Sequence, residues 1–292
     1  MYADDSALIV AGKNIADIQQ TLTSQLESVR EWLIDNKLSL HLGKTESILF
    51  GSKRRLSVQD TLQVSCAGNI ISSKTCVKYI GLDIDQSLSG ECIADKLVSR
   101  CNSKLKFLYR QARHFDLPTK RLLVSSLIQS HFDYASSSWF SGLTKTHQRR
   151  LQVMQNKVIR FLLNADTRTH IGPAQFTQVQ MLPVELRVQQ LKLNHMYNIF
   201  HNKAPSYLAS SFTSTHNIHI INTRSSNRSF SIPHVKSFGH TSFRFTGARL
   251  WNQLPNHIQY SDSKSVFKSR VKQFLFHQMV LDSERDYVYL TL

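Results

Sequence analysis

YADDSALIVAG, residues 2–12, is the sharpest signal in the sequence. Residues 6–11 form a short apolar run between two aspartates and Gly12, a pattern that predicts a buried strand leaving a tight turn at residues 3–5. Adjacent carboxylates repel each other, so Asp4 and Asp5 beside a buried strand favour a counter-charge such as a divalent metal ion. Two magnesium ions about 4 Å apart activate an attacking hydroxyl and stabilise a leaving pyrophosphate. Alternatively, the aspartates belong to an ordinary solvated turn.

Downstream of this run, the spacing of apolar residues changes twice. Asn14 is placed to cap a helix whose apolar positions, from Ile15 to Leu33, fall at steps of three and four residues. From residue 38 to 85 the period shortens, and Gly, Ser and Asn bound the segments, which predicts a set of short antiparallel strands. After Glu91 the helical period returns. We expect helices over the following ranges: 93–115, 119–132, 146–163, 183–200 and 264–279.

The charge of the chain is distributed unevenly. The formal net charge is +16, yet residues 1–100 hold 11 basic and 12 acidic residues. Residues 101–292 hold 25 basic and 8 acidic residues, an excess of 17 positive charges. Such an asymmetry indicates a polyanionic partner for the second part, with nucleic acid favoured over an ordinary basic surface. Aromatic residues alternate with the basic ones, and they serve either to stack on bases or to fill the core: Trp139, Phe140, Phe243, Phe245 and Trp251.

Cysteine spacing and hydropathy exclude several other classes of protein. The four cysteines include no CxxC pair, so neither a zinc site nor a disulfide framework is indicated, and reduced thiols are expected. No apolar run approaches the roughly 20 residues of a membrane span, and Asp4 and Asp5 do not suit a signal peptide. We therefore expect no membrane partner and an intracellular location, in the nucleus or the cytoplasm.

Several motifs together resemble non-LTR, LINE-type retrotransposon reverse transcriptases. YADD with SALIVAG looks like the metal-binding hairpin of that family, and LSLHLGKTESILFG and KYIGLDID follow at similar spacing. Later segments resemble the thumb and C-terminal region of the same family in their order: SSLIQSHFDYASSSW, LQVMQNKVIRFLL, LPVELRVQQLKL, SFRFTGARLWNQLP and VFKSRVKQFL. The resemblance thus spans nearly the whole chain, although its specific motifs lie in the first 85 residues.

The resemblance implies roles for individual residues of the first segment. Asp4 matches the metal-ligating carboxylate and Asp5 its neighbour, with Mg²⁺ or Mn²⁺ as the ion, while Tyr2 and Ala3 would line the primer and nucleotide side. Lys44 matches a lysine near the triphosphate that donates a proton to the leaving pyrophosphate, or it is a plain surface lysine. Tyr79 and Gly81 resemble the hairpin that grips the primer, or they belong to an ordinary turn.

These expectations combine into an α+β fold with four segments. Residues 1–90 would form a partial polymerase palm of antiparallel strands plus a helix, and residues 91–209 a basic helical thumb. A linker at 210–240 and a small C-terminal domain at 241–292 would follow. Within the thumb, basic pairs at helical spacing are candidates for backbone contacts, because Lys and Arg neutralise phosphates without reading sequence: Arg149, Arg150, Lys157 and Arg160.

The function implied is RNA-directed DNA synthesis by the enzyme of a transposable element. Its partners would be an RNA template, a DNA primer and deoxynucleoside triphosphates. Only Met1 precedes Tyr2, so the fingers and the first catalytic aspartate of the family are absent from the sequence. We therefore expect a truncated polymerase that is inactive alone. The alternatives are a nucleic-acid-binding fragment without catalysis and a retired sequence without a selected function.

Overall fold

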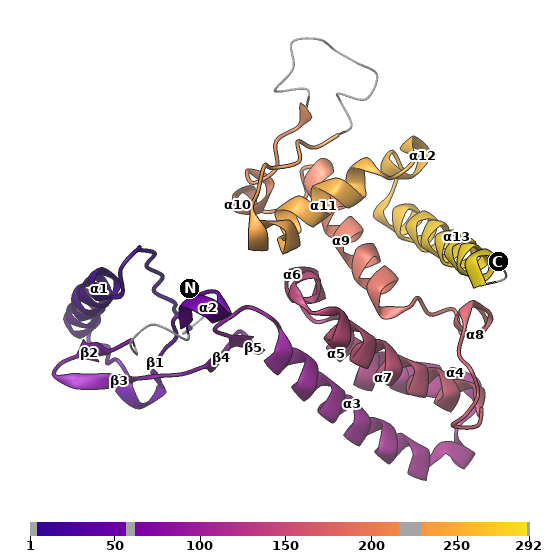
Figure 1. Ribbon diagram of the computed structural model, residues 1–292, viewed down its shortest axis with the longest axis horizontal. Helices are drawn as coiled ribbons and strands as arrows, with labels where there is room; N and C mark the ends of the chain where they lie inside the picture. Colours follow the sequence, from indigo (N-terminus) through magenta and orange to yellow (C-terminus); the bar gives the residue numbers. More distant parts are fainter. Residues whose placement is uncertain (1–4, 57–61, 216–228, 291–292) are drawn as a thin grey trace. The chain divides into compact units, whose positions relative to one another are not determined.

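The described residues form two compact units. The computed structural model describes residues 5–56, 62–215 and 229–290 (Figure 1). Unit 1 comprises Met1–Asp95 and unit 2 comprises Lys96–Leu292. The structure is mixed α+β with helices in the majority, which agrees with the predicted α+β class. Among the described residues, strands β1 to β5 all lie in unit 1.

Unit 1 begins with the helix that the apolar spacing predicted. Helix α1 covers Ile15–Asp35, and Asn14 precedes it in an extended conformation. The Asn14 side chain donates to Asp17 Oδ2 at 3.2 Å and makes no capping bond to the helix backbone. The start of the helix is therefore confirmed, whereas the capping hydrogen bond is not formed.

Two small sheets follow α1. The first has the order β1-β3-β2 and the second pairs β4 with β5. β2 runs antiparallel to β3, and β4 runs antiparallel to β5, as predicted. β1, however, runs parallel to β3. A parallel pairing needs a long crossover, and the chain between β1 and β3 supplies one through α2 and β2. The remaining bounds in this region are η1 Leu42–Lys44, β1 Glu46–Ser47, α2 Lys53–Leu56, β2 Val64–Cys66, β3 Asn69–Ser73, β4 Cys76–Tyr79 and β5 Leu82–Asp85.

Both antiparallel hairpins of unit 1 turn on two residues with positive φ. Ala67 and Gly68 join β2 to β3 with φ of 49° and 75°, and Ile80 and Gly81 join β4 to β5 with φ of 46° and 76°. Positive φ at both central positions is the type I′ pattern, whose twist matches that of the flanking strands. A hairpin turn therefore lies at residues 80–81, as the sequence indicated, whereas its contact with a primer stays a prediction.

The strand predicted at residues 6–11 is wrong. Those residues form no strand, and the Leu8 and Ile9 side chains are 42% and 86% exposed. A strand needs a partner for its backbone N–H and C=O groups, and within the described part of the chain none of β1 to β5 pairs with this segment. Local apolar character alone therefore did not bury the run.

The core of unit 1 is small. Four buried residues from β2, β3 and the segment before β2 pack against partly buried side chains of α1: Leu62, Val64, Cys66 and Ile71. Glu27 of α1 accepts hydrogen bonds from Arg30 Nε at 2.6 Å and from the backbone N–H of Ala67 at 3.1 Å. These bonds lower the pKa of Glu27, Arg30 having the largest effect. They tie the helix to the β2–β3 turn.

Unit 2 continues from α3 as a series of packed helices. Asp116 caps α4 by accepting from the Thr119 backbone N–H at 2.9 Å, and Pro118 lies in the first turn, where its missing N–H does no harm. A π-helical segment separates α4 from α5. The bounds are α3 Glu91–Arg110, η2 Ala112–His114, α4 Leu117–Val124, η3 Ser125–Gln129, α5 Ser130–Asp133, α6 Ser136–Trp139, η4 Phe140–Gly142 and α7 Lys145–Leu163.

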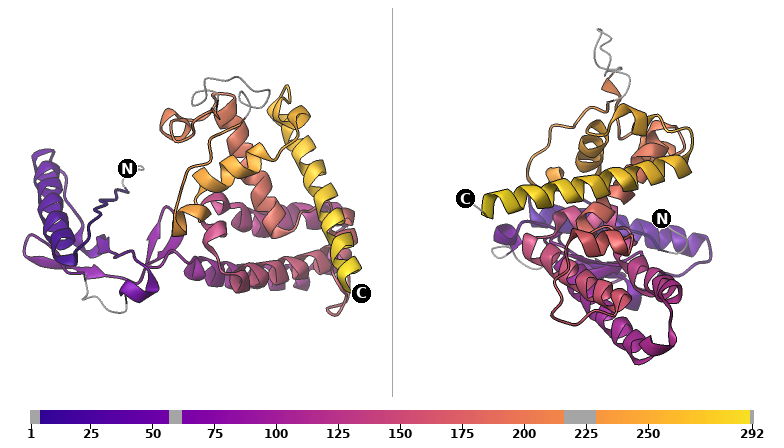
Figure 2. Two further views of the ribbon diagram at one scale, coloured as in Figure 1. Left: turned by 45° about the horizontal axis from the view of Figure 1, so that its top comes forward. Right: turned by 90° about the vertical axis from the view of Figure 1, so that its right-hand side faces the viewer.

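Helix α9 packs both on helices that precede it and on helices that follow it in unit 2. It packs on α5, α6 and α7 and also on α11 and α13, as Figures 1 and 2 show. Trp251, Tyr197 and Phe267 are fully buried where α9, α11 and α13 meet. The bounds are α8 Pro173–Gln178, α9 Val184–Phe200, α10 Ser206–Ala209, η6 Ser237–Thr241, α11 Phe243–Asn252, α12 Asn256–Gln259 and α13 Lys264–Leu290.

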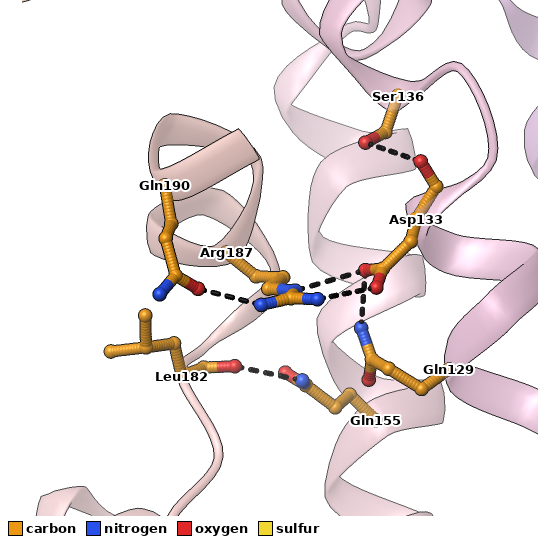
Figure 3. A network of polar contacts seen from close by, with 7 residues as sticks. All are labelled: Gln129, Asp133, Ser136, Gln155, Leu182, Arg187 and Gln190. Atoms are coloured by element: carbon orange, nitrogen blue, oxygen red, sulfur yellow. Dashed lines mark hydrogen bonds and ion pairs between the residues drawn. The ribbon is translucent and has the colours of Figure 1, made fainter. Parts of the chain in front are cut away.

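Two polar groups connect the helices of unit 2. Arg187 of α9 binds both carboxylate oxygens of Asp133, with Nη2–Oδ2 at 2.6 Å and Nε–Oδ1 at 3.1 Å (Figure 3). Lys192 is buried, and its Nζ donates to Ser141 Oγ at 2.6 Å and to Thr246 Oγ1 at 2.8 Å. α9 is thereby joined to α5, η4 and α11.

The segment predicted as a linker, residues 210–240, is partly outside the described residues, because 216–228 are not described. Its described flanks pack into unit 2. Ser214 bridges to Phe230, and the Asn252 side chain binds both the N–H and the carbonyl of Phe230, at 2.9 and 2.8 Å. The segments expected as a helical thumb, 91–209, and as a small C-terminal domain, 241–292, both contribute residues to one hydrophobic core.

Candidate nucleic-acid interface

Helix α7 presents one exposed basic face. At about 100° per residue, Arg149, Arg150, Lys157 and Arg160 fall within an arc of roughly 100°. The opposite face is buried in the helical core by the following residues: Leu151, Met154, Gln155, Val158, Ile159, Phe161 and Leu162. Because that apolar face fixes the rotation of the helix, the basic side chains share the outer side.

The four basic residues of α7 differ in how freely they reach solvent. Arg149, Arg150 and Lys157 are exposed, and Arg160 is half-buried. Lys157 Nζ approaches Asn102 Oδ1 of α3 at 3.4 Å. Arg160 Nε donates to the Thr169 carbonyl at 2.9 Å, so this side chain also holds the loop that follows α7.

Helix α3 adds basic and aromatic side chains beside this face. Asn102, Lys106 and Tyr109 lie one turn apart on one side of α3, and Asn102 contacts α7 through Lys157. Tyr109 meets Phe161 of α7 edge-to-face, with ring centroids 5.0 Å apart. Burial raises the pKa of Tyr109, and the positive charge of Arg160 opposes that rise. The tyrosine therefore lies next to the basic face of α7.

We call the following exposed residues of the two helices the α3–α7 basic surface: Lys106, Tyr109, Arg110, Arg149, Arg150 and Lys157. Sequence analysis singled out the residues on α7 but missed those on α3. The step of four between Lys106 and Arg110 was a usable signal for a shared face. The adjacency of α3 and α7 had no signal in the sequence.

The residues of the YADD motif are only partly described. Tyr2, Ala3 and Asp4 lie outside the described residues, and Asp5 is exposed. In the part of the chain that the structure describes, no group of three His, Cys, Asp or Glu side chains is arranged to hold a metal ion.

The other residues singled out in unit 1 lie on turns. Lys44 ends the η1 turn and is exposed. Tyr79 is the last residue of β4, half-buried, and Gly81 is the second residue of the hairpin turn. The positive φ of Gly81 accounts for a glycine at this position without a ligand.

The aromatic residues considered for base stacking mostly belong to the core. Trp251, Trp139 and Phe140 are buried, and Phe243 packs against the cluster around Trp251. The core interpretation is confirmed for these four. Exposed aromatic surface on the basic helices comes instead from Phe107 and Tyr109, which are 60% and 47% exposed.

Comparisons with protein-family models, with curated proteins and with solved structures yield no match to this chain. All four cysteines are free thiols, in agreement with the sequence analysis. Of the helices in the described residues, none combines the length and the apolar character needed to span a membrane.

Proposed function

We propose that unit 2 binds the sugar–phosphate backbone of an RNA–DNA duplex, and that the chain is the C-terminal part of a non-LTR reverse transcriptase. The observation that carries the binding proposal is the α3–α7 basic surface. It gathers five Lys and Arg side chains on two adjacent helices, in the part of the chain that holds the excess of 17 positive charges.

The chemistry of this surface suits phosphate contacts better than base recognition. Lys and Arg neutralise phosphates and release condensed counterions, a contribution that does not depend on sequence. Asn102 and Tyr109 are the neutral polar side chains placed beside them, and Tyr109 is engaged with Phe161. Affinity should therefore depend strongly on salt and weakly on sequence.

The polymerase part of the proposal rests on the resemblance of YADD, KTE and YIGLDID. In that family the palm carries the catalytic carboxylates, with Asp4 as ligand of Mg²⁺ or Mn²⁺ and Asp5 beside it, while Lys44 would lie near the triphosphate. When bound, the ions would activate the primer hydroxyl and stabilise the pyrophosphate. In keeping with the expectation from the sequence, we propose that the chain alone binds duplex without extending it.

Nucleic-acid binding without any catalytic role is the second candidate. The distribution of charge favours it, because unit 2, with 27 basic and 8 acidic residues, holds all of the basic excess and none of the YADD, KTE and YIGLDID motifs. The two candidates share the α3–α7 basic surface and differ in what the palm-like segment does.

One experiment addresses both candidates. The full chain is titrated with a labelled RNA–DNA hybrid and with a hybrid of scrambled sequence, and the same samples receive deoxynucleoside triphosphates with magnesium or manganese. We expect equal affinity for the two hybrids and no primer extension. Absence of hybrid binding at low salt would refute the proposal for unit 2. Primer extension that disappears in Asp4→Ala would show that the chain is an active polymerase by itself.

A further inference from the structure

A pocket of about 300 Å³ lies in unit 2, separate from the α3–α7 basic surface. Its walls come from α4, the π-helical segment η3, the 179–182 segment, α9 and α13. The lining residues on which the argument depends are Arg121, Gln129, Leu182, Arg187, Gln190 and Lys272. Its volume is at the lower end of the range found for small-molecule sites.

Three cationic side chains line this pocket. Arg187 is paired with Asp133, and Arg121 donates from Nη2 to the Gln178 carbonyl at 3.1 Å. Burial lowers the pKa of Lys272, and the positive charges of Arg187 and Arg121 lower it further. Within the described residues, no carboxylate pairs with Arg121 or Lys272. Among the described residues, the pocket therefore has three lining cations and one carboxylate, that of Asp133, paired with them.

Two glutamine side chains that line the pocket are fixed by hydrogen bonds to Asp133 and Arg187. Gln129 Nε2 donates to Asp133 Oδ1 at 2.8 Å, and Gln190 Oε1 accepts from Arg187 Nη1 at 2.6 Å (Figure 3). Gln190 is buried, so these hydrogen bonds hold both glutamine side chains in fixed positions on the wall of the pocket.

The local backbone also sets this pocket apart. Residues Ser125–Gln129 form a π-helical turn between α4 and α5, and both Ser125 and Gln129 line the pocket. π-Helical turns are rare and occur frequently at functional sites, because they displace one side chain and one carbonyl from the regular ladder. Here the turn contributes Gln129 to the wall beside Arg187.

We propose that this pocket binds the phosphate group of a phosphorylated ligand, with Arg121, Arg187 and Lys272 as its cationic contacts. Arg187 keeps its paired edge on Asp133, so Arg121 supplies the planar guanidinium that can match phosphate oxygens in pairs, and three cations exceed what one carboxylate needs. The apolar wall of Val124, Val179 and Leu182 would pack against the rest of the ligand. The ligand is either a free nucleotide or the phosphorylated end of a nucleic-acid strand.

Calorimetry on the full chain with inorganic phosphate, adenosine 5′-monophosphate and adenosine tests this proposal. We expect the two phosphates to bind and adenosine not to bind. Lys272→Met and Arg121→Met should each weaken phosphate binding by about tenfold, whereas Lys264→Met, an exposed residue of the same helix, should leave it unchanged. Thermal unfolding of each variant verifies that it is folded.

Further titrations distinguish a strand end from a free nucleotide as the ligand. They also separate phosphate binding in the pocket from duplex binding by the α3–α7 basic surface. A 5′-phosphorylated oligonucleotide that binds more tightly than both its unphosphorylated form and the mononucleotide identifies a strand end. Equal affinity for mononucleotide and phosphorylated strand identifies a free nucleotide. Replacing Arg149, Arg150 and Lys157 by Ala should leave phosphate binding intact even where duplex binding is lost. Equal binding of adenosine and its phosphate, tighter binding of a glutamate-rich peptide, or equal loss in Lys264→Met would overturn the pocket proposal.

Discussion

Helices α1 of unit 1 and α7 of unit 2 have similar lengths and the same apolar period, but they are buried to very different extents. α1 has no buried residue, and its Trp32 is 61% exposed. α7 buries seven residues against the other helices of unit 2. The period of apolar residues therefore predicts where a helix forms and which face it would bury. The partner surface decides whether that face is removed from water.

The same contrast separates the two units. Among the described residues, the core cluster beside α1 in unit 1 has four buried members, whereas the cluster around Trp251 in unit 2 has thirteen. Unit 2 also carries the basic excess. We infer that stability and polyanion binding both reside mainly in unit 2, and the following predictions test that division.

Matched leucine truncations should produce the largest difference between the units. Leu151 of α7 is fully buried, so Leu151→Ala should lower the free energy of unfolding by about 2–5 kcal/mol. Leu26 of α1 is only partly buried, and Leu26→Ala should cost about 1 kcal/mol. Urea denaturation followed by circular dichroism measures both. Equal costs would show that α1 is as well packed as α7.

Buried Lys192 gives unit 2 a characteristic dependence on pH. Burial lowers its pKa to about 8, below the value of about 10.4 in an unfolded chain. Between these two values the unfolded state binds a proton that the folded state has released, so stability should rise with pH from 8 towards 10. Relative to Lys192→Met, the gain should be about 2 kcal/mol. Lys264→Met, which removes an exposed lysine, is the control. If the free energy of unfolding changed with pH in the same way in the wild type and in Lys192→Met, the lowered pKa of Lys192 would be contradicted.

Asp85 gives unit 1 a smaller dependence on pH, of the same sign as that of Lys192 but in the acidic range. Burial raises its pKa, but hydrogen bonds from Ser89, Ser87 and Gly90 outweigh burial, and the net pKa is lowered. The stabilisation should be complete above the unfolded value of about 3.9 and disappear as the pH falls through the folded value. At neutral pH, Asp85→Asn should cost about 1 kcal/mol. A cost that stays constant down to pH 2 would contradict the assignment.

Local sequence patterns predicted the elements of this protein better than their contacts. The long helices follow from apolar spacing, and the Ile80–Gly81 turn follows from a glycine between two short apolar runs. Residues 6–11 carried an equally clear apolar run but form no strand, because a strand depends on a partner that local sequence does not specify.

The two candidate sites also differ in how much of each could be predicted from the sequence. Arg149, Arg150 and Lys157 were predictable, since helical spacing places them on one face. The pocket was not, because Arg121, Arg187 and Lys272 come from three helices and meet only through packing. The π-helical turn at Ser125–Gln129 had no signal either, since its sequence also suits a regular helix.

The salt dependence of hybrid binding is the most direct test of the proposal that the α3–α7 basic surface binds the phosphates of a duplex. The full chain is compared with a triple variant of the α3–α7 basic surface, Arg149→Ala with Arg150→Ala and Lys157→Ala. The matched control removes two arginines and one lysine that are exposed on α11 and α13: Arg244, Arg249 and Lys268. Arg160 stays, because it holds the loop after α7. The account predicts weaker binding and a log–log salt slope reduced by about 2–3 in the first variant only. Equal losses in both variants, or none in the first, would contradict it.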